Sequence, residues 1–188
     1  MKLVEGVGVN DANYKVRVDG ISCKYYRKWK SMLRRCYSSI FLKRNPTYVG
    51  CEVCEDWKTF SVFREWMISQ EHLHGTLECL ELDKDIIVPR NKIYGPDYCC
   101  FISKELNAFT ADKISNTKTP RGVYKIRDGV FRASCRNPFT AKQIHLGQYE
   151  TASLAHIAWK SYKHTIACQL ADNVKDPRAS LALKQRYK

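Results

Sequence analysis

The stretch 80–107, LELDKDIIVPRNKIYGPDYCCFISKELN, gathers side chains that could carry chemistry. Asp83 and Asp85 stand on either side of Lys84, and Asn91 and Asn107 follow. Carboxylate and amide oxygens are the ligands that hard cations prefer, and a carboxylate can also act as a general base. An ammonium has an ordinary pKa of about 10.4 and cannot accept a proton at neutral pH unless its surroundings lower that value by several units. The two neighbouring carboxylates would instead raise the pKa of this ammonium. The spacing therefore does not show which residue would act as the base.

The elements that must position this stretch can be predicted from apolar spacing. Residues 24–38 carry apolar side chains at helical intervals, with basic residues such as Lys30 and Arg34 on the other side. That basic side is either a solvated surface or a contact for phosphates. Residues 57–69 predict a second helix whose aromatic residues belong to the core. Residues 77–88 have β character and are ended by a proline.

Residues 122–170 predict three short strands followed by a helix. Asp128-Gly129 is typical of a hairpin turn, and Thr151 is expected to cap the helix. Apolar and polar side chains alternate along the second strand, which puts Arg132 and Arg136 on one face. We therefore expect one face of the sheet to pack under the helix and the other to expose arginine, lysine and glutamine.

The charge of the chain is strongly basic and unevenly distributed. Lysine and arginine number 32 against 19 acidic residues, a net charge of +13, and residues 120–188 hold 13 basic and 4 acidic side chains. This excess favours a polyanionic partner, most simply nucleic acid, with a solvated basic surface as the alternative. No apolar run approaches the roughly 20 residues of a membrane span, and no signal-peptide pattern opens the chain, so we expect an intracellular protein with no membrane partner. Nine irregularly spaced cysteines argue against a disulfide framework.

These features predict an α+β protein made of two small domains. Residues 1–108 form the first domain, and the polar segment 109–120, which ends in proline, is expected to be a linker. Residues 121–175 form the second domain, and residues 176–188 are expected to be a basic tail.

Blocks of the C-terminal third occur in the order of a known domain. They are Gly122-Val123, Phe131-Arg132-Ala133, HLGQYETA from His145 to Ala152, and Ala155 with Ala158. This order resembles the Apetala-type, or ethylene-responsive-factor, DNA-binding domain. The resemblance implies a three-stranded antiparallel sheet, packed on one helix, that lies in the major groove of double-stranded DNA. The DNA-contacting candidates that it implies are Arg121, Lys125, Arg127, Arg132, Arg136 and Lys142.

Blocks of the N-terminal part also occur in a familiar order. They are Trp29 to Tyr37, Val53 to Trp57 with Phe60 and Phe63, Leu82 to Ile86, and Asn91-Lys92 with Tyr94, Pro96, Cys99, Phe101 and Asn107. This order resembles phage-encoded proteins of the HNH endonuclease class that carry the same C-terminal domain. The resemblance implies a small ββα-metal fold with added helices and a homing-type DNA endonuclease activity, in the cytoplasm of a bacterial host.

The resemblance also implies roles for the residues of the opening stretch. Asp83 would bind a divalent cation at the end of the first strand, and Asn107 would complete the metal shell from the helix. Asn91 would brace the loop between the strands. The oxygen ligands favour Mg²⁺ or Mn²⁺, which would assist hydrolysis of a phosphodiester bond.

Lys84 departs from this pattern, because a histidine usually stands there. It could be a base tuned by its surroundings. It could instead hold the scissile phosphate while Asp85, His72 or His74 serves as base. In the third reading the site is inactive and Lys84 pairs with acids. The chain would then be a DNA-binding or host-protein-targeting protein rather than an enzyme.

The cysteines leave one further alternative. Cys51 and Cys54 have the spacing of half a zinc site, and Cys99-Cys100 would have to supply the other half. Adjacent cysteines seldom both reach one tetrahedral ion. We therefore expect buried thiols in preference to structural Zn²⁺.

Overall fold

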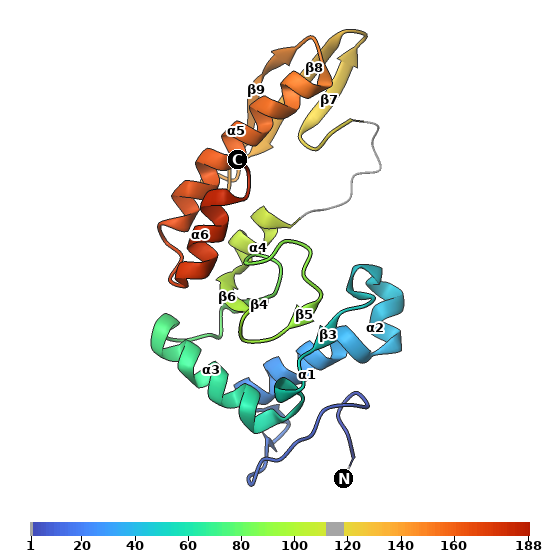
Figure 1. The fold of residues 1–188 in the computed structure, drawn as a ribbon, viewed down its shortest axis with the longest axis vertical. Helices are drawn as coiled ribbons and strands as arrows, with labels where there is room; N and C mark the ends of the chain where they lie inside the picture. The colour runs from blue at the N-terminus through green and yellow to red at the C-terminus, as the bar shows by residue number, and fades with distance from the viewer. Residues whose placement is uncertain (1, 112–118) are drawn as a thin grey trace. The chain divides into compact units, whose positions relative to one another are not determined.

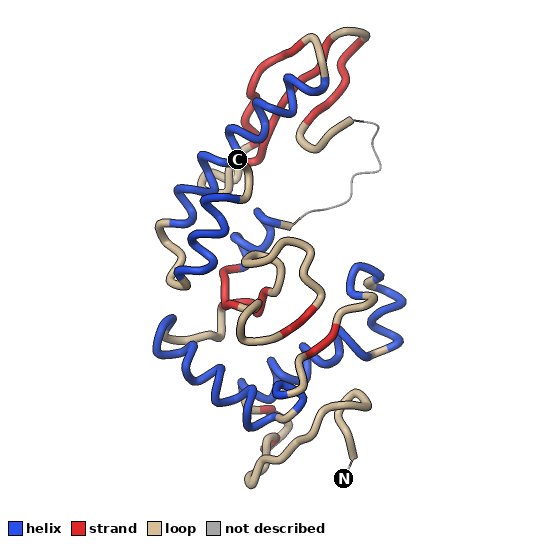
Figure 2. The backbone as a smooth tube through the Cα atoms, viewed as in Figure 1, coloured by secondary structure: helices blue, strands red, loops and turns tan. Residues whose placement is uncertain are grey.

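The structure is a computed structural model that describes residues 2–111 and 119–188 (Figure 1). The chain divides into two compact units, Met1–Ser103 and Lys104–Lys188. The positions of the two units relative to one another are not determined, so each is described by itself. Helices and strands occur in both units (Figure 2), which confirms the predicted α+β class. In the described part of the chain, no helix combines the length and apolar character that crossing a membrane requires.

The first unit combines helices with very short strands. Its helices are α1 (Lys24–Tyr37), α2 (Ser39–Arg44) and α3 (Phe60–His74), with the 3-10 turns η1 (Pro46–Tyr48) and η2 (Asp56–Lys58). Its strands pair as β1 (Arg17–Val18) with β2 (Ile21–Ser22), β3 (Glu52–Val53) with β5 (Ile93–Tyr94), and β4 (Leu80–Asp83) with β6 (Cys100–Ser103). The β3–β5 pair is parallel and the other two are antiparallel.

Helix α1 forms the centre of the first unit, as the apolar spacing predicted. Its side chains at intervals of three and four residues are buried, namely Trp29, Met32, Leu33 and Cys36. They pack with buried residues of α3, namely Phe60, Phe63 and Met67. The indole N–H of Trp29 donates to the carbonyl oxygen of Trp57 at 2.7 Å, so the one polar group of this side chain is satisfied inside the core.

Helix α3 is longer than the sequence predicted. It begins at Phe60, after η2, and continues to His74, where Gly75 with a φ of 77° ends it. His72 and His74, which lie beyond the end predicted for this helix, belong to its last turn.

The second unit contains the predicted three-stranded sheet. Its elements are α4 (Lys104–Thr110), β7 (Val123–Arg127), β8 (Val130–Arg136), β9 (Gln143–Tyr149), α5 (Ala152–Ala171) and α6 (Pro177–Gln185). The strand order is β7-β8-β9, and both pairs are antiparallel. Gly129, with a φ of 71°, lies in the predicted hairpin turn. The Thr151 hydroxyl accepts from the Leu154 N–H at 3.2 Å, which confirms the predicted cap of α5.

Small residues bring α5 close to one face of this sheet. Val123, Ala133 and Ala155 are buried together, and Phe131 and Tyr149 pack around them. Because Ala155 on α5 and Ala133 on β8 are both small, the helix can approach the sheet closely. The face of the sheet opposite α5 is left for other contacts.

The C-terminal residues form a packed helix where a basic tail was expected. Asp176 caps α6 through its side chain, and Pro177 occupies the first helical turn. Ala179, Leu183 and Tyr187 recur every four residues and are buried. The expected boundary after residue 108 also differs from the contact boundary, because α4 belongs to the second unit. Most of the expected linker, residues 112–118, lies outside the described residues.

Candidate functional site

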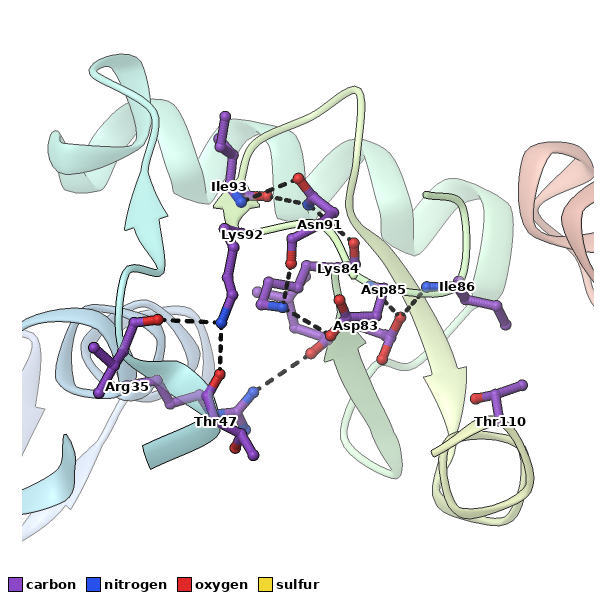
Figure 3. Close-up of polar contacts among 12 residues, drawn as sticks. Arg35, Thr47, Asp83, Lys84, Asp85, Ile86, Asn91, Lys92, Ile93 and Thr110 are labelled. Atoms are coloured by element: carbon purple, nitrogen blue, oxygen red, sulfur yellow. Dashed lines mark hydrogen bonds and ion pairs between the residues drawn. The ribbon is translucent and has the colours of Figure 1, made fainter. Parts of the chain in front are cut away.

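Strand β4 is held in place by two basic side chains of α1, and it ends at Asp83. Lys28 donates from Nζ to the Leu80 carbonyl. Arg35, labelled in Figure 3, makes a long contact of 3.5 Å from Nη1 to the Leu82 carbonyl. On the other side, Asp83 pairs with Cys100 of β6. The carboxylate thus stands at the end of a strand whose two edges are both occupied.

The Asp83 carboxylate organises the turn that follows it. Its Oδ1 accepts from the backbone N–H of Asp85 at 2.8 Å and of Ile86 at 2.7 Å. Burial raises the pKa of the Asp83 carboxyl above its ordinary value, while these two hydrogen bonds act in the opposite direction. Both hydrogen bonds fall on Oδ1, so Oδ2 is the oxygen that Asp83 can offer to a ligand.

The Lys84 ammonium is enclosed in the loop after β4. The side chain is only 6% exposed, and Nζ donates to Asp85 Oδ2 at 2.7 Å and to the Asn91 carbonyl at 2.6 Å (Figure 3). Nζ also lies 5.9 Å from the centroid of the Tyr94 ring. Both hydrogen-bond partners are acceptors, so the ammonium serves as a donor to each. The structure thus shows Lys84 paired with one acid, Asp85, and with one backbone carbonyl, that of Asn91.

Asn91 braces the same loop from its other end. Its Nδ2 donates to the Lys84 carbonyl at 3.0 Å and to the Ile93 carbonyl at 2.6 Å, and its Oδ1 accepts from the Ile93 N–H at 3.1 Å. Lys84 and Asn91 therefore bind each other twice, each side chain to the other's carbonyl. These are the contacts that a loop-bracing asparagine needs.

The structure brings together four of the five predicted centre residues. Asp83 ends strand β4, and Lys84, Asp85 and Asn91 lie in the loop that follows it in the first unit. Asn107 lies in α4 of the second unit, so its position relative to Asp83 is not determined. Within residues 2–111 and 119–188, no three histidine, cysteine or acidic side chains are grouped closely enough to hold a metal ion.

The cysteines considered for zinc are core residues. Cys51, Cys99 and Cys100 are buried, and Cys54 is partly buried. Burial raises the pKa of the Cys99 thiol to about 12 and that of Cys51 above its ordinary value. In the absence of a metal, burial therefore favours the thiol form of these two side chains.

The second unit offers a separate surface, the outer face of the sheet, which we define as the side away from α5. Residues directly opposite one another on paired strands share a face. Val123 pairs with Ala133, which belongs to the core under α5. The neighbouring row therefore lies on the outer face, and it consists of Tyr124, Arg132 and Gln148.

Two more rows extend the outer face along the strands. Ser134 pairs with His145, and Arg136 pairs with Gln143. Ser134 is buried although the alternation predicted exposure, because Gln143 Nε2 donates to Ser134 Oγ at 2.9 Å and covers it. The guanidinium of Arg132 lies 5.8 Å from the Tyr124 ring centroid, an arrangement that orients a cation over an aromatic face.

The predicted DNA-contacting residues separate into groups. Arg132 and Arg136 are exposed on the outer face, and Arg127, opposite Val130, is exposed at the hairpin end. Lys142 is exposed in the turn between β8 and β9. Lys125 pairs with Phe131, on the side of α5, and forms an ion pair with Asp128.

Arg121 does not lie on the outer face. Its Nη2 donates to the Ala111 carbonyl at 2.5 Å, and its guanidinium lies 5.6 Å from the Trp159 ring centroid. Lys163 Nζ donates to the Phe109 carbonyl at 2.6 Å, and Arg186 Nη2 to the Thr110 carbonyl at 3.1 Å. Three cations thus bind the carbonyl end of α4, where the helix dipole is negative.

Tyr124 and His145 are exposed on the outer face although sequence reasoning did not single them out. Strict alternation along the first and third strands was the available signal, since Tyr124 follows the buried Val123 and His145 lies between Ile144 and Leu146. A bulge at Leu146 and another near Ile126 interrupt that alternation.

The chain was compared with family models, curated proteins and solved structures. No family model matches the chain, and neither the curated proteins nor the solved structures give a match.

Proposed function

We propose that this protein binds double-stranded DNA through the outer face of its β7–β9 sheet. The main observation in support is that one face of the sheet packs under α5, while the outer face presents Arg127, Arg132 and Arg136 to solvent. The three strands contain no acidic residue. A ribbon of two or three strands fits the major groove, and arginine can donate two parallel hydrogen bonds to guanine.

The polar neighbours of these arginines support the same proposal. Gln148 lies in the row of Arg132, and Gln143 in the row of Arg136. Glutamine can bind the edge of adenine, and both it and arginine can reach phosphate oxygens. The excess of 13 basic over 4 acidic residues in positions 120–188 adds attraction for any polyanion.

Replacing Arg132 and Arg136 together by alanine tests this proposal. We expect duplex affinity to fall at least about tenfold and the slope of log affinity against log salt to fall by about two, because two phosphate or base contacts are lost. The matched control removes the same charge outside the sheet, as Lys175→Ala with Lys184→Ala. Fluorescence anisotropy with a labelled duplex at several salt concentrations measures the affinity and the salt slope of each variant. Equal effects of the two double variants would rule out the outer face as the DNA surface.

A second candidate function is hydrolysis of phosphodiester bonds at Asp83. The observation in its favour is the order strand, braced loop, strand and helix from β4 through Asn91 to β6 and α4. Mg²⁺ needs only one or two protein carboxylates because it keeps water and binds substrate phosphate. Asp83 Oδ2 would hold such an ion, which would polarise the phosphate and acidify a bound water. Lys84 and Asn91 would keep the loop in shape.

Cleavage of supercoiled plasmid in Mg²⁺ or Mn²⁺ tests the second candidate. We expect wild-type protein to nick the plasmid and Asp83→Ala to lose nicking while keeping duplex affinity, because Asp83 is remote in sequence from the sheet. Glu78→Ala, an exposed acid just before β4, is the control and should keep wild-type activity. Absence of nicking by wild-type protein at concentrations that saturate the DNA would contradict this candidate. The loop would then be a scaffold in a DNA-binding protein.

A further inference from the structure

Residues 24–44, which form α1 and α2, contain eight lysine and arginine residues and no acid. The structure divides these eight cations into two groups. Three hold neighbouring elements: Lys24 pairs with Glu71 at 2.6 Å, Lys28 binds the Leu80 carbonyl, and Arg35 contacts the Leu82 carbonyl. Those three add polar links from α1 to α3 and β4.

The other five cations face solvent, and we call them the α1–α2 ridge. They are Arg27, Lys30, Arg34, Lys43 and Arg44, and all five are exposed. Within the described part of the chain, no carboxylate pairs with any member of the ridge. Uncompensated charge concentrated in this way raises the local potential.

The members of the ridge lie on two neighbouring helices, α1 and α2. Arg27, Lys30 and Arg34 are spaced by three and four residues, which places them on one side of a helix. The Arg34 guanidinium lies 6.0 Å from the Phe41 ring centroid, so α2 lies beside the C-terminal part of α1. Lys43 and Arg44 then extend the charge from the last turn of α2.

We propose that the α1–α2 ridge binds the phosphate backbone of duplex DNA. From Arg27 to Arg34 the helix rises about 10 Å at 1.5 Å per residue. Four successive phosphates of one strand rise by about the same length, because they are separated by three steps of about 3.4 Å. A row of flexible cations at this spacing suits a regular polyanion, and it carries no sequence information by itself. This surface rests on the proposed DNA-binding function and adds a contact that the outer face does not supply.

Removing the charge of the ridge tests this inference in the full-length protein. The variant is Arg27→Ala with Lys30→Ala and Arg34→Ala, which leaves Lys24, Lys28 and Arg35 to hold the fold. Its control removes three exposed cations elsewhere in the first unit, as Lys2→Ala, Lys15→Ala and Arg17→Ala. Anisotropy titrations with one labelled duplex at several NaCl concentrations give the affinity and the salt slope. Thermal melting of both triple variants checks that the fold is intact.

We expect the ridge variant to lower the salt slope by about two to three, at about 0.9 per phosphate contact, and the control to change it by less than about one. The loss should persist in the background of Arg132→Ala with Arg136→Ala, because the two surfaces make separate contacts. Equal slopes and affinities for the ridge and control variants would overturn the inference. A loss in the ridge variant with no effect of Arg132→Ala and Arg136→Ala would instead overturn the outer-face proposal and leave the ridge standing.

Discussion

Gly122→Ala is expected to lower the free energy of unfolding of the second unit by about 3–5 kcal/mol. Gly122 has a φ of 77°, and a Cβ there would lie 1.9 Å from Cδ1 of Trp159. Trp159 cannot move aside easily, since it is buried, stacks on His156 at a centroid distance of 5.4 Å and meets Tyr187 edge-on at 6.1 Å. Such a loss approaches the whole stability of a small domain.

Gly129→Ala is the matched control for this prediction. Gly129 also has a positive φ, 71°, but no atom lies within 4 Å of its ideal Cβ position. Only backbone strain is added, at about 1–2 kcal/mol. Hydrogen-exchange mass spectrometry separates the two units, and we expect protection to fall in residues 119–188 of the Gly122 variant while residues 2–103 keep theirs. Similar losses in the two variants would show that contact with Trp159 is not what excludes a side chain at Gly122.

Lys84→Met is expected to destabilise the first unit by about 3 kcal/mol. Methionine has similar length but cannot donate, so the partly buried Asn91 carbonyl loses the ammonium at 2.6 Å, and Asp85 loses the ammonium with which it forms an ion pair at 2.7 Å. Asp85 is 43% exposed at its side chain, so water replaces part of that pair and limits the loss. Urea unfolding followed by hydrogen exchange in residues 80–103 measures the change.

Lys92→Met is the control, because Lys92 also donates to two carbonyls, of Thr47 at 2.8 Å and Val49 at 3.1 Å, but from an exposed position. Its loss should cost less than about 1 kcal/mol. The comparison also decides what Lys84 does. If Lys84→Met kept wild-type stability and lost plasmid nicking, its role would be chemical and the scaffold reading would be wrong.

Local signals in the sequence were enough to predict much of the fold. The apolar spacing of α1, the Asp128-Gly129 turn and the Thr151 cap each depend on contacts within a few residues, and each is confirmed. The alternation along β8 also placed Arg132 and Arg136 on the exposed face. A recurring apolar residue every four positions, at Ala179, Leu183 and Tyr187, was a comparable signal for α6 that the basic composition obscured.

The remaining features depend on contacts between distant residues. Arg121 was predicted at the DNA surface from the family resemblance alone, but it contacts the carbonyl of Ala111 and the ring of Trp159 instead. Ser134 is covered by Gln143 from the next strand. Lys84 could be recognised as a departure from a motif, whereas its reciprocal bonds with Asn91 depend on the closure of a loop. No spacing rule predicts contacts of this kind.

The contacts from α1 to β4 also bear on association between molecules. A strand at the edge of a small sheet leaves backbone carbonyls that can pair with a strand of another chain. Leu80 and Leu82 are two residues apart, so their carbonyls point to the same edge, and Lys28 and Arg35 bind both. The same two side chains that position Asp83 therefore close this edge to strand addition, and their charge repels a second copy of a chain whose net charge is +13.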